Sequence, residues 1–174
     1  MIFNPKNAAW LLLSVFVFVI DQWTKQLITA QFDYREVLPV FAAGNGGFNL
    51  TLAHNYGASF SFLADQSGWQ RWLFAGIASV VGVGLVVWLL RLPKGSVLLS
   101  LALTLLIGGA FGNLYDRVVH GYVVDFLDVF YGAYHWPAFN VADSAICAGA
   151  ALLLPESFFS SSHQEAGKSQ EKNA

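Results

Sequence analysis

Two uncharged stretches of membrane-spanning length constrain this sequence most strongly. Trp72 to Leu90 holds nineteen consecutive residues without a charged side chain, and Gly95 to Tyr115 is a second uncharged stretch. A helix needs about 20 apolar residues to cross the roughly 30 Å hydrocarbon core of a bilayer. Because backbone amides in hydrocarbon must be satisfied within the protein, such stretches fold as helices. The sequence therefore predicts a membrane protein with helical spans.

Two further apolar stretches complete the predicted bundle. The first starts at Ala8 and continues beyond Ile20 without the small-residue cleavage site of a secretory leader, so we expect it to be retained. The last starts near Pro137 and is expected to bend or end at Pro155. The prediction is an all-α membrane bundle of four transmembrane helices within a single domain of residues 1–159. The predicted helices cover approximately residues 8–29, 70–91, 95–116 and 138–159.

The composition agrees with this class and excludes several others. Hydrophobic residues make up 56% of the 174 residues and charged residues only 11%, against about 25% charged residues in a soluble domain. The few basic residues form no stripe or cluster, which argues against nucleic-acid binding. The single cysteine, Cys147, has no disulfide partner and is expected to be a small buried side chain. No histidine lies in a predicted span, which argues against a haem-binding subunit.

The two segments outside the spans, residues 31–68 and 117–137, differ in pattern. In the first, Glu36–Phe41 and Phe48–Ala53 are predicted strands, with the glycine-rich stretch 44–47 as the turn between them. This pattern predicts a small extramembrane β-sheet. The second segment is predicted to be a loop that carries two acids among aromatic residues. The polar residues 160–174 are predicted to form a disordered tail.

Basic residues beside the spans indicate the orientation. They divide five to four between the two sides, and the short basic turn Arg91–Lys94 joins the second and third spans. Because short cytoplasmic loops are enriched in Lys and Arg, we expect both termini in the cytoplasm and both long segments on the outer, periplasmic side. The ends of the first and third spans and the start of the fourth then meet at the outer face of the membrane.

This topology gathers polar side chains at one level. Seven of them lie at the outer ends of three spans: Asp21, Lys25, Asn113, Asp116, Arg117, Asn140 and Asp143. The long segments add Asn55 and Asp125 above them. So many polar groups exceed what hydrogen bonding between helices would require. The sequence predicts a functional site near the outer face of the membrane.

Individual residues in this group also have simpler interpretations. Asp143 lies in an apolar stretch, where an ionised carboxylate costs about 2.5–3.5 kcal/mol, so it should face protein or water. A structural hydrogen bond to a neighbouring helix is the alternative to a catalytic role. Asp21 and Lys25 have the acid-before-base i, i+4 spacing of a stabilising ion pair on a helix. For these two residues an ion pair is at least as good an interpretation as a catalytic role.

Carboxylates are the most plausible reactive groups. The helices contain no serine with a nearby histidine and acid, no H-E-x-x-H sequence and no cysteine with a base. Two carboxyl groups that share one proton can work together, one as a base on water and the other as an acid. Asp143 is the natural first member, and Asp125, Asp116 or Asp128 could be the second. A proton-coupled transporter is the competing class, but it would need an acid near the midplane with access from both sides.

Five sequence motifs, in order along the chain, resemble those of the bacterial lipoprotein signal peptidase family, signal peptidase II. They are Asp21-Gln22-Trp23-Thr24-Lys25, Asn55-Tyr56-Gly57-Ala58-Ser59-Phe60, Gly108 to Arg117, Val123-Val124-Asp125-Phe126 and Phe139-Asn140-Val141-Ala142-Asp143. Any one motif alone would be weak. Together they cover nearly the whole chain except the polar tail after Pro155.

The resemblance implies an aspartyl endopeptidase of the bacterial plasma membrane. It would remove the signal peptide from diacylglyceryl-modified prolipoproteins by cleaving before the lipidated cysteine, with Asp125 and Asp143 as the catalytic dyad. The supporting residues implied by the motifs are Asp21, Lys25, Asn55, Gly57, Asn113, Asp116, Arg117 and Asn140. Substrate and membrane lipid would be the partners of a monomer that uses neither metal nor cofactor. The family fold adds a short periplasmic helix, expected at 58–64, and we expect the segment 55–64 that contains it to move as a lid.

Overall fold

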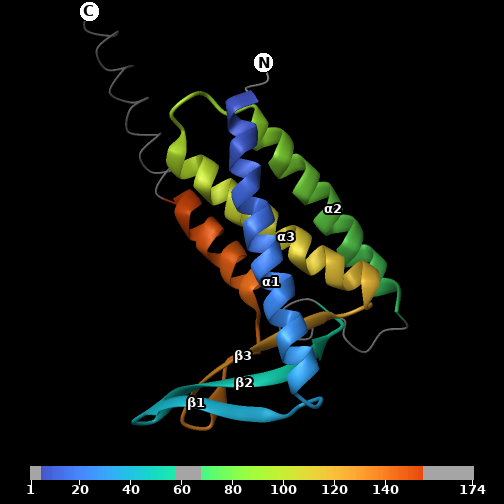
Figure 1. Ribbon diagram of the computed structural model, residues 1–174, viewed down its shortest axis with the longest axis vertical. Helices are drawn as coiled ribbons and strands as arrows, with labels where there is room; N and C mark the ends of the chain where they lie inside the picture. The colour runs from blue at the N-terminus through green and yellow to red at the C-terminus, as the bar shows by residue number, and fades with distance from the viewer. Residues whose placement is uncertain (1–4, 58–67, 155–174) are drawn as a thin grey trace, which may run out of the picture.

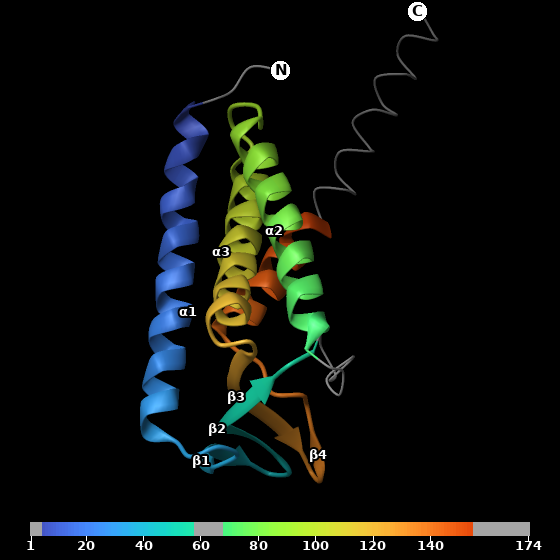
Figure 2. The same cartoon turned by 90° about the vertical axis from the view of Figure 1, so that its right-hand side faces the viewer.

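The computed structural model describes residues 5–57 and 68–154 (Figure 1). A bundle of helices forms one end of the molecule and a small β-sheet forms the other, with the N-terminus at the end far from the sheet (Figures 1 and 2). The helical elements are the 3-10 helix η1 (Pro5–Trp10), α1 (Leu11–Gln31), α2 (Trp69–Leu90), α3 (Val97–Val119) and a C-terminal helix (Val141–Leu154).

Three of these helices are long and apolar enough to cross a membrane: Asn7–Gln31, Trp69–Leu90 and Val97–Val119. This finding confirms three of the predicted apolar helices. The C-terminal helix is also apolar but shorter within the described residues. A fourth membrane span therefore stays a prediction.

Helix α3 lies at the centre of the bundle. Half of its apolar stretch is buried inside the protein, against 17% for α2. A methyl group built on Gly112 would lie only 2.6 Å from Asp21 Oδ2 of α1. A methyl group on Gly149 of the C-terminal helix would lie 2.8 Å from the carbonyl oxygen of Ala102 in α3. Small residues thus permit close packing of α3 against its neighbouring helices.

Four antiparallel strands form the sheet in the order β1-β2-β3-β4. They are β1 (Val37–Ala43), β2 (Gly46–Asn55), β3 (Val123–Tyr131) and β4 (Tyr134–His135). The two strands predicted in the first segment are confirmed: β1 begins one residue later and ends two residues later than predicted, and β2 extends two residues further at each end. The turn between them contains only Gly44 and Asn45, and Gly44 has a positive φ of 58°.

The prediction that the second segment is a loop is wrong, because it contains β3. Residues Val123 to Phe126 are all buried, as is Asp128, so this strand lacks the alternation of apolar and polar residues that marks a half-exposed strand. Its core side chain Phe126 packs with Leu52 of β2 and Ile28 of α1. This cluster fixes the sheet against the end of α1.

Three further expectations concern a short helix, the polar tail and Cys147. The predicted short helix at 58–64 and the predicted tail at 160–174 lie outside the described residues. The expectation that Cys147 is buried is wrong. Its side chain is exposed because it lies on the outer face of the C-terminal helix.

Candidate active site

Asp125 is a buried acid held only by neutral side chains. It lies in β3 opposite Ala53 of β2, next to an irregularity in the strand pairing, and is 3% exposed. Its Oδ2 accepts a hydrogen bond of 3.0 Å from Asn55 Nδ2. Its Oδ1 accepts one of 2.7 Å from Asn140 Nδ2. Bulges of this kind often re-aim a side chain beside an active site, and here the irregularity lies next to the strand end that carries Asn55.

Asp143 lies in the first turn of the C-terminal helix. Asn140 caps this helix, because its Oδ1 accepts a 2.8 Å hydrogen bond from the Asp143 backbone N–H. The Asp143 carboxylate accepts a hydrogen bond of 2.7 Å from Asn113 Nδ2. Asn140 is fully buried and therefore ties the two acids together. Its amide nitrogen binds Asp125 and its amide oxygen binds the backbone of Asp143.

The surroundings of Asp125 favour its protonated form. Burial first, and then the negative charge of Asp143, raise the pKa of Asp125 from 3.8 to about 7. The hydrogen bonds from Asn55 and Asn140 favour the ionised form but do not offset these effects. An acid with a pKa near 7 is partly protonated at neutral pH.

A second buried cluster is centred on Lys25, which is 2% exposed. Its Nζ lies 2.8 Å from Asp21 Oδ2 and 2.9 Å from Asp116 Oδ2. It also donates a 3.1 Å hydrogen bond to Asn113 Oδ1. All three ammonium hydrogens thus have acceptors. The ion pair between Asp21 and Lys25 that the sequence predicted is confirmed, and Asp116 joins it.

Asn113 connects the two clusters. Its amide oxygen faces Lys25, and its amide nitrogen faces Asp143. An ammonium group can only donate, so Lys25 fixes which end of the Asn113 amide points at the carboxylate. The lysine thus orients the partner of Asp143 although it does not touch the acid pair directly.

Arg117 secures the end of β2 near the acids. Its Nη2 donates to the carbonyl oxygen of Gly57 at 3.1 Å, and its guanidinium carbon lies 5.5 Å from the ring centroid of Phe74. The Gly57 N–H in turn donates to Asn55 Oδ1 at 3.1 Å. This arrangement leaves the Asn55 amide nitrogen aimed at Asp125.

The structure joins every predicted site residue into one network of hydrogen bonds and ion pairs. It also separates the three candidates for the second acid. Asp116 is paired with Lys25, whereas Asp128 binds Asn49 at 2.8 Å and His135 at 2.8 Å elsewhere in the sheet. Only Asp125 has purely amide partners and interacts with the charge of Asp143.

Sequence reasoning missed Gln22 as a site residue. Its Nε2 donates to Asp116 Oδ1 at 2.8 Å and to the Gly112 carbonyl at 3.2 Å. Gln22 and Lys25 also line a cavity of about 250 Å³ between α1, α3 and the sheet. An amide one residue after a buried acid, within an apolar helix, was the available signal.

His54 stacks on Tyr122 with ring centroids 3.9 Å apart. Burial, together with the charge of His120, lowers the pKa of His54, which favours a neutral ring. Among residues 5–57 and 68–154, no three His, Cys, Asp or Glu side chains are grouped to hold a metal ion.

Comparison with known proteins identifies the family. The family profile described as Signal peptidase (SPase) II matches residues 13–159 of this chain. The chain belongs to the signal peptidase II family. Signal peptidase II enzymes are aspartic peptidases, which agrees with the carboxylate chemistry that the sequence predicted.

Curated signal peptidase II relatives match most of the chain. The lipoprotein signal peptidase of Acinetobacter baumannii is 51% identical over 157 residues, which cover 90% of this chain and 87% of the relative. That of Acinetobacter baylyi is 48% identical over 157 residues, with coverage of 90% and 86%. The Vibrio cholerae enzyme is 51% identical over 154 residues and covers 86% of each chain.

Solved structures agree in fold with this signal peptidase II chain. A bacterial membrane enzyme determined by the in meso method at 2.3 Å resolution matches with a TM-score of 0.80 and 30% identity. The match covers 94% of this chain and 95% of the solved one. A second bacterial membrane enzyme, at 1.9 Å resolution, matches with a TM-score of 0.73 and 29% identity, over 90% and 96% of the chains.

Proposed function

We propose that this protein removes the signal peptide from diacylglyceryl-modified prolipoproteins by cleaving before the lipidated cysteine. Asp125 and Asp143 activate the attacking water. The observation that carries the proposal is the pair of acids whose direct partners are neutral amides, with the pKa of Asp125 raised to about 7. Membership of the signal peptidase II family and relatives named lipoprotein signal peptidase support it.

The two carboxyl groups share the proton transfers. The ionised carboxylate takes a proton from water as the water oxygen attacks the scissile carbonyl carbon. The protonated carboxyl group donates its proton to the carbonyl oxygen. Collapse of the tetrahedral intermediate breaks the C–N bond, and the proton taken from water passes to the leaving amine. The hydroxyl proton of the intermediate returns to the acid pair, which again holds one proton.

The remaining residues support this chemistry without entering it. Asn140 links the two acids, and Asn113 holds the Asp143 carboxylate. Lys25 fixes the Asn113 amide and neutralises charge on Asp21 and Asp116. Such positioning matters because proton transfer requires heavy atoms within about 2.6–3.2 Å of each other.

The proposed setting is the bacterial inner membrane. The chain would cross it four times, with both termini in the cytoplasm and the active site near the outer face. A monomer without a nucleic-acid partner would suffice, because the acid pair and its contacts all come from one chain. A lipid-anchored substrate presents its scissile bond at the membrane surface, which is the level of the acid pair in this topology.

A cleavage assay tests the proposal. The purified protein in lipid bilayers is incubated with a diacylated prolipoprotein, and mass spectrometry identifies the products. We expect a released signal peptide and a mature protein that begins with the lipidated cysteine. Cleavage of an unlipidated precursor at an equal rate, or no cleavage by correctly folded protein, would contradict the proposal.

A further inference from the structure

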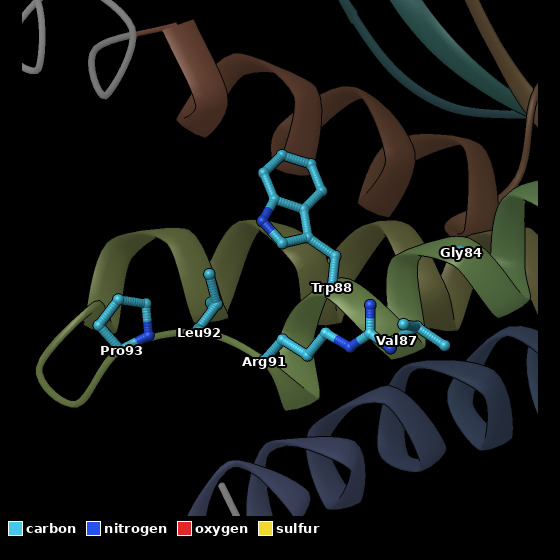
Figure 3. A pocket seen from close by; sticks show the side chains of 6 residues that line it. All are labelled: Gly84, Val87, Trp88, Arg91, Leu92 and Pro93. Carbon is cyan, nitrogen blue, oxygen red and sulfur yellow. The ribbon is translucent and has the colours of Figure 1, made fainter. Parts of the chain in front are cut away.

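A hollow lies at the end of α2 that points away from the sheet (Figures 1 and 3). Its volume is about 420 Å³. Three of its residues come from the last turns of α2 and three from the connection that follows: Gly84, Val87, Trp88, Arg91, Leu92 and Pro93. No residue of the acid network contributes to it.

The hollow has the shape of a groove along one helix face. Gly84, Val87, Trp88 and Arg91 follow an i, i+3, i+4, i+7 spacing, which places them on one side of α2. Seven residues of helix span about 10 Å. A methyl group built on Gly84 would meet no atom within 4 Å, so the missing side chain leaves the groove open. Trp88 is 46% exposed and forms part of its wall.

Asn7 of η1 holds the end of α2 that forms this groove. Asn7 Nδ2 donates hydrogen bonds of 3.0 Å to the carbonyl oxygens of both Leu89 and Leu92. The Leu89 carbonyl also accepts a bond of 3.2 Å from the Leu92 N–H, and the bonds from Asn7 add a partner to both carbonyl groups at the end of the helix. The groove is therefore preorganised rather than created by its ligand.

Arg91 gives the groove a positive charge. Figure 3 shows its side chain running back along α2, with the guanidinium group near Val87. No Asp or Glu of residues 5–57 and 68–154 forms an ion pair with Arg91. A cation beside apolar side chains at a membrane boundary is costly unless an anion or water meets it.

We infer that this groove binds one anionic phospholipid. The Arg91 guanidinium binds the lipid phosphate, and the start of one acyl chain lies in the groove beside Gly84 and Trp88. A planar guanidinium suits bidentate binding of phosphate, and tryptophan favours the headgroup level of a bilayer. A lipid fits better than a soluble anion because the groove wall is largely apolar and α2 is the least buried of the three long helices. The inference rests on membrane insertion but not on peptidase activity.

Native mass spectrometry of the detergent-solubilised full chain tests this inference. The protein is titrated separately with phosphatidylglycerol and with phosphatidylcholine of the same acyl chains. We expect the first phosphatidylglycerol to bind about fivefold more tightly, the factor that corresponds to about 1 kcal/mol for one basic residue at an anionic lipid. Arg91→Gln should remove this preference. Lys94→Gln, a matched change in the same turn but outside the groove, should keep it.

A second pair of variants tests the apolar part of the groove. Gly84→Leu should weaken the first binding event for both lipids, because leucine fills the open space. Gly76→Leu places the same side chain at another open position of α2 and should bind as the parent protein does. Equal losses for Arg91→Gln and Lys94→Gln, or unchanged binding by Gly84→Leu, would overturn the inference. Displacement of the lipid by millimolar glycerol phosphate would also overturn it, since a free anion would then suffice.

Discussion

The two buried acid clusters of this protein share Asn113 but differ in their charge balance. Asp21 and Asp116 face the ammonium group of Lys25 at 2.8 and 2.9 Å. Asp125 and Asp143 face only amide groups in their direct hydrogen bonds. The first pair forms ion pairs with a cation, whereas a buried acid held by amides beside another acid can keep a proton. Aspartate side chains thus have a structural role in one cluster, whereas in the other they can hold a proton.

The difference also explains why the clusters lie side by side. Amides that hold a carboxylate must present their nitrogen rather than their oxygen, and a hydrogen-bond donor that faces the amide oxygen enforces this choice. Lys25 enforces it at Asn113, and the cap of the C-terminal helix enforces it at Asn140. The charged cluster therefore orients Asn113, whereas a backbone N–H orients Asn140.

The largest expected effect is the loss of cleavage when either member of the acid pair becomes an amide. Asp125→Asn and Asp143→Asn should each reduce turnover by about 10²–10⁴-fold or more, because an amide can neither accept nor return the proton. Turnover of diacylated prolipoprotein by the folded variants measures this. Asp128→Asn is the matched control on the same strand and should remain active. Near-normal turnover by either dyad variant would move the chemistry elsewhere.

Replacing the cation of the other cluster should mainly reduce stability. Lys25→Met leaves two buried carboxylates without their cation, which should cost about 3–5 kcal/mol of unfolding free energy. Thermal unfolding in detergent measures the loss, and Lys94→Met in the exposed turn should unfold like the parent. Full stability with abolished turnover would instead make Lys25 part of the chemistry.

Lys25 should also be energetically coupled to Asp21. A double-mutant cycle with Asp21→Asn and Lys25→Met is expected to give an interaction free energy of about 0.5–3 kcal/mol, because each change removes the partner of the other. Additive losses in unfolding free energy would show that the two side chains act independently.

A smaller effect is expected at the residue between the clusters. Asn113→Ala removes one hydrogen bond to a carboxylate, a contribution of about 1.5–3 kcal/mol, and should lower turnover by about 10- to 100-fold. Substrate affinity should change less than turnover. Asn45→Ala in the exposed β1–β2 turn is the control and should behave as the parent. A loss confined to substrate affinity would contradict the positioning role.

The smallest expected effects concern pH. Turnover should fall as pH rises above about 7, where the acid pair loses its shared proton. The raised pKa of Asp125 also means that the native state holds a proton that the unfolded chain has released. Stability from this group is therefore complete below about pH 4 and is lost as pH rises through about 7. Asp125→Asn should flatten the dependence of unfolding temperature on pH between these values, and a parent-like dependence would contradict the assignment.

The sequence predicted the long apolar helices and the clustering of the polar side chains better than the sheet. Uncharged stretches such as Trp72–Leu90 identify membrane helices because hydrocarbon tolerates few other folds. The i, i+4 spacing of Asp21 and Lys25 directly predicted an ion pair that the structure contains. Strand β3 was missed because its residues are buried on both faces and show no alternation.

The spacing of residues along the chain did not predict which distant segments contact one another. Asp116, Asp125 and Asp128 were all candidates to join Asp143, and only tertiary contacts separate them. Asp116 meets a lysine that lies 91 positions earlier in the chain, and Asp128 meets His135 in the sheet. Gln22 was overlooked because a single amide in a helix gains its meaning only from its partner.

The most direct test of the account is to detect the proton held by the acid pair. Infrared difference spectroscopy between pH 6 and pH 9 can report the carbonyl stretch of a protonated carboxylic acid. We expect one such band at pH 6, lost at pH 9, absent in Asp125→Asn and retained in Asp128→Asn. If the parent shows no such band, or if the band persists in Asp125→Asn and disappears in Asp116→Asn, the proposed contrast between the two clusters is wrong.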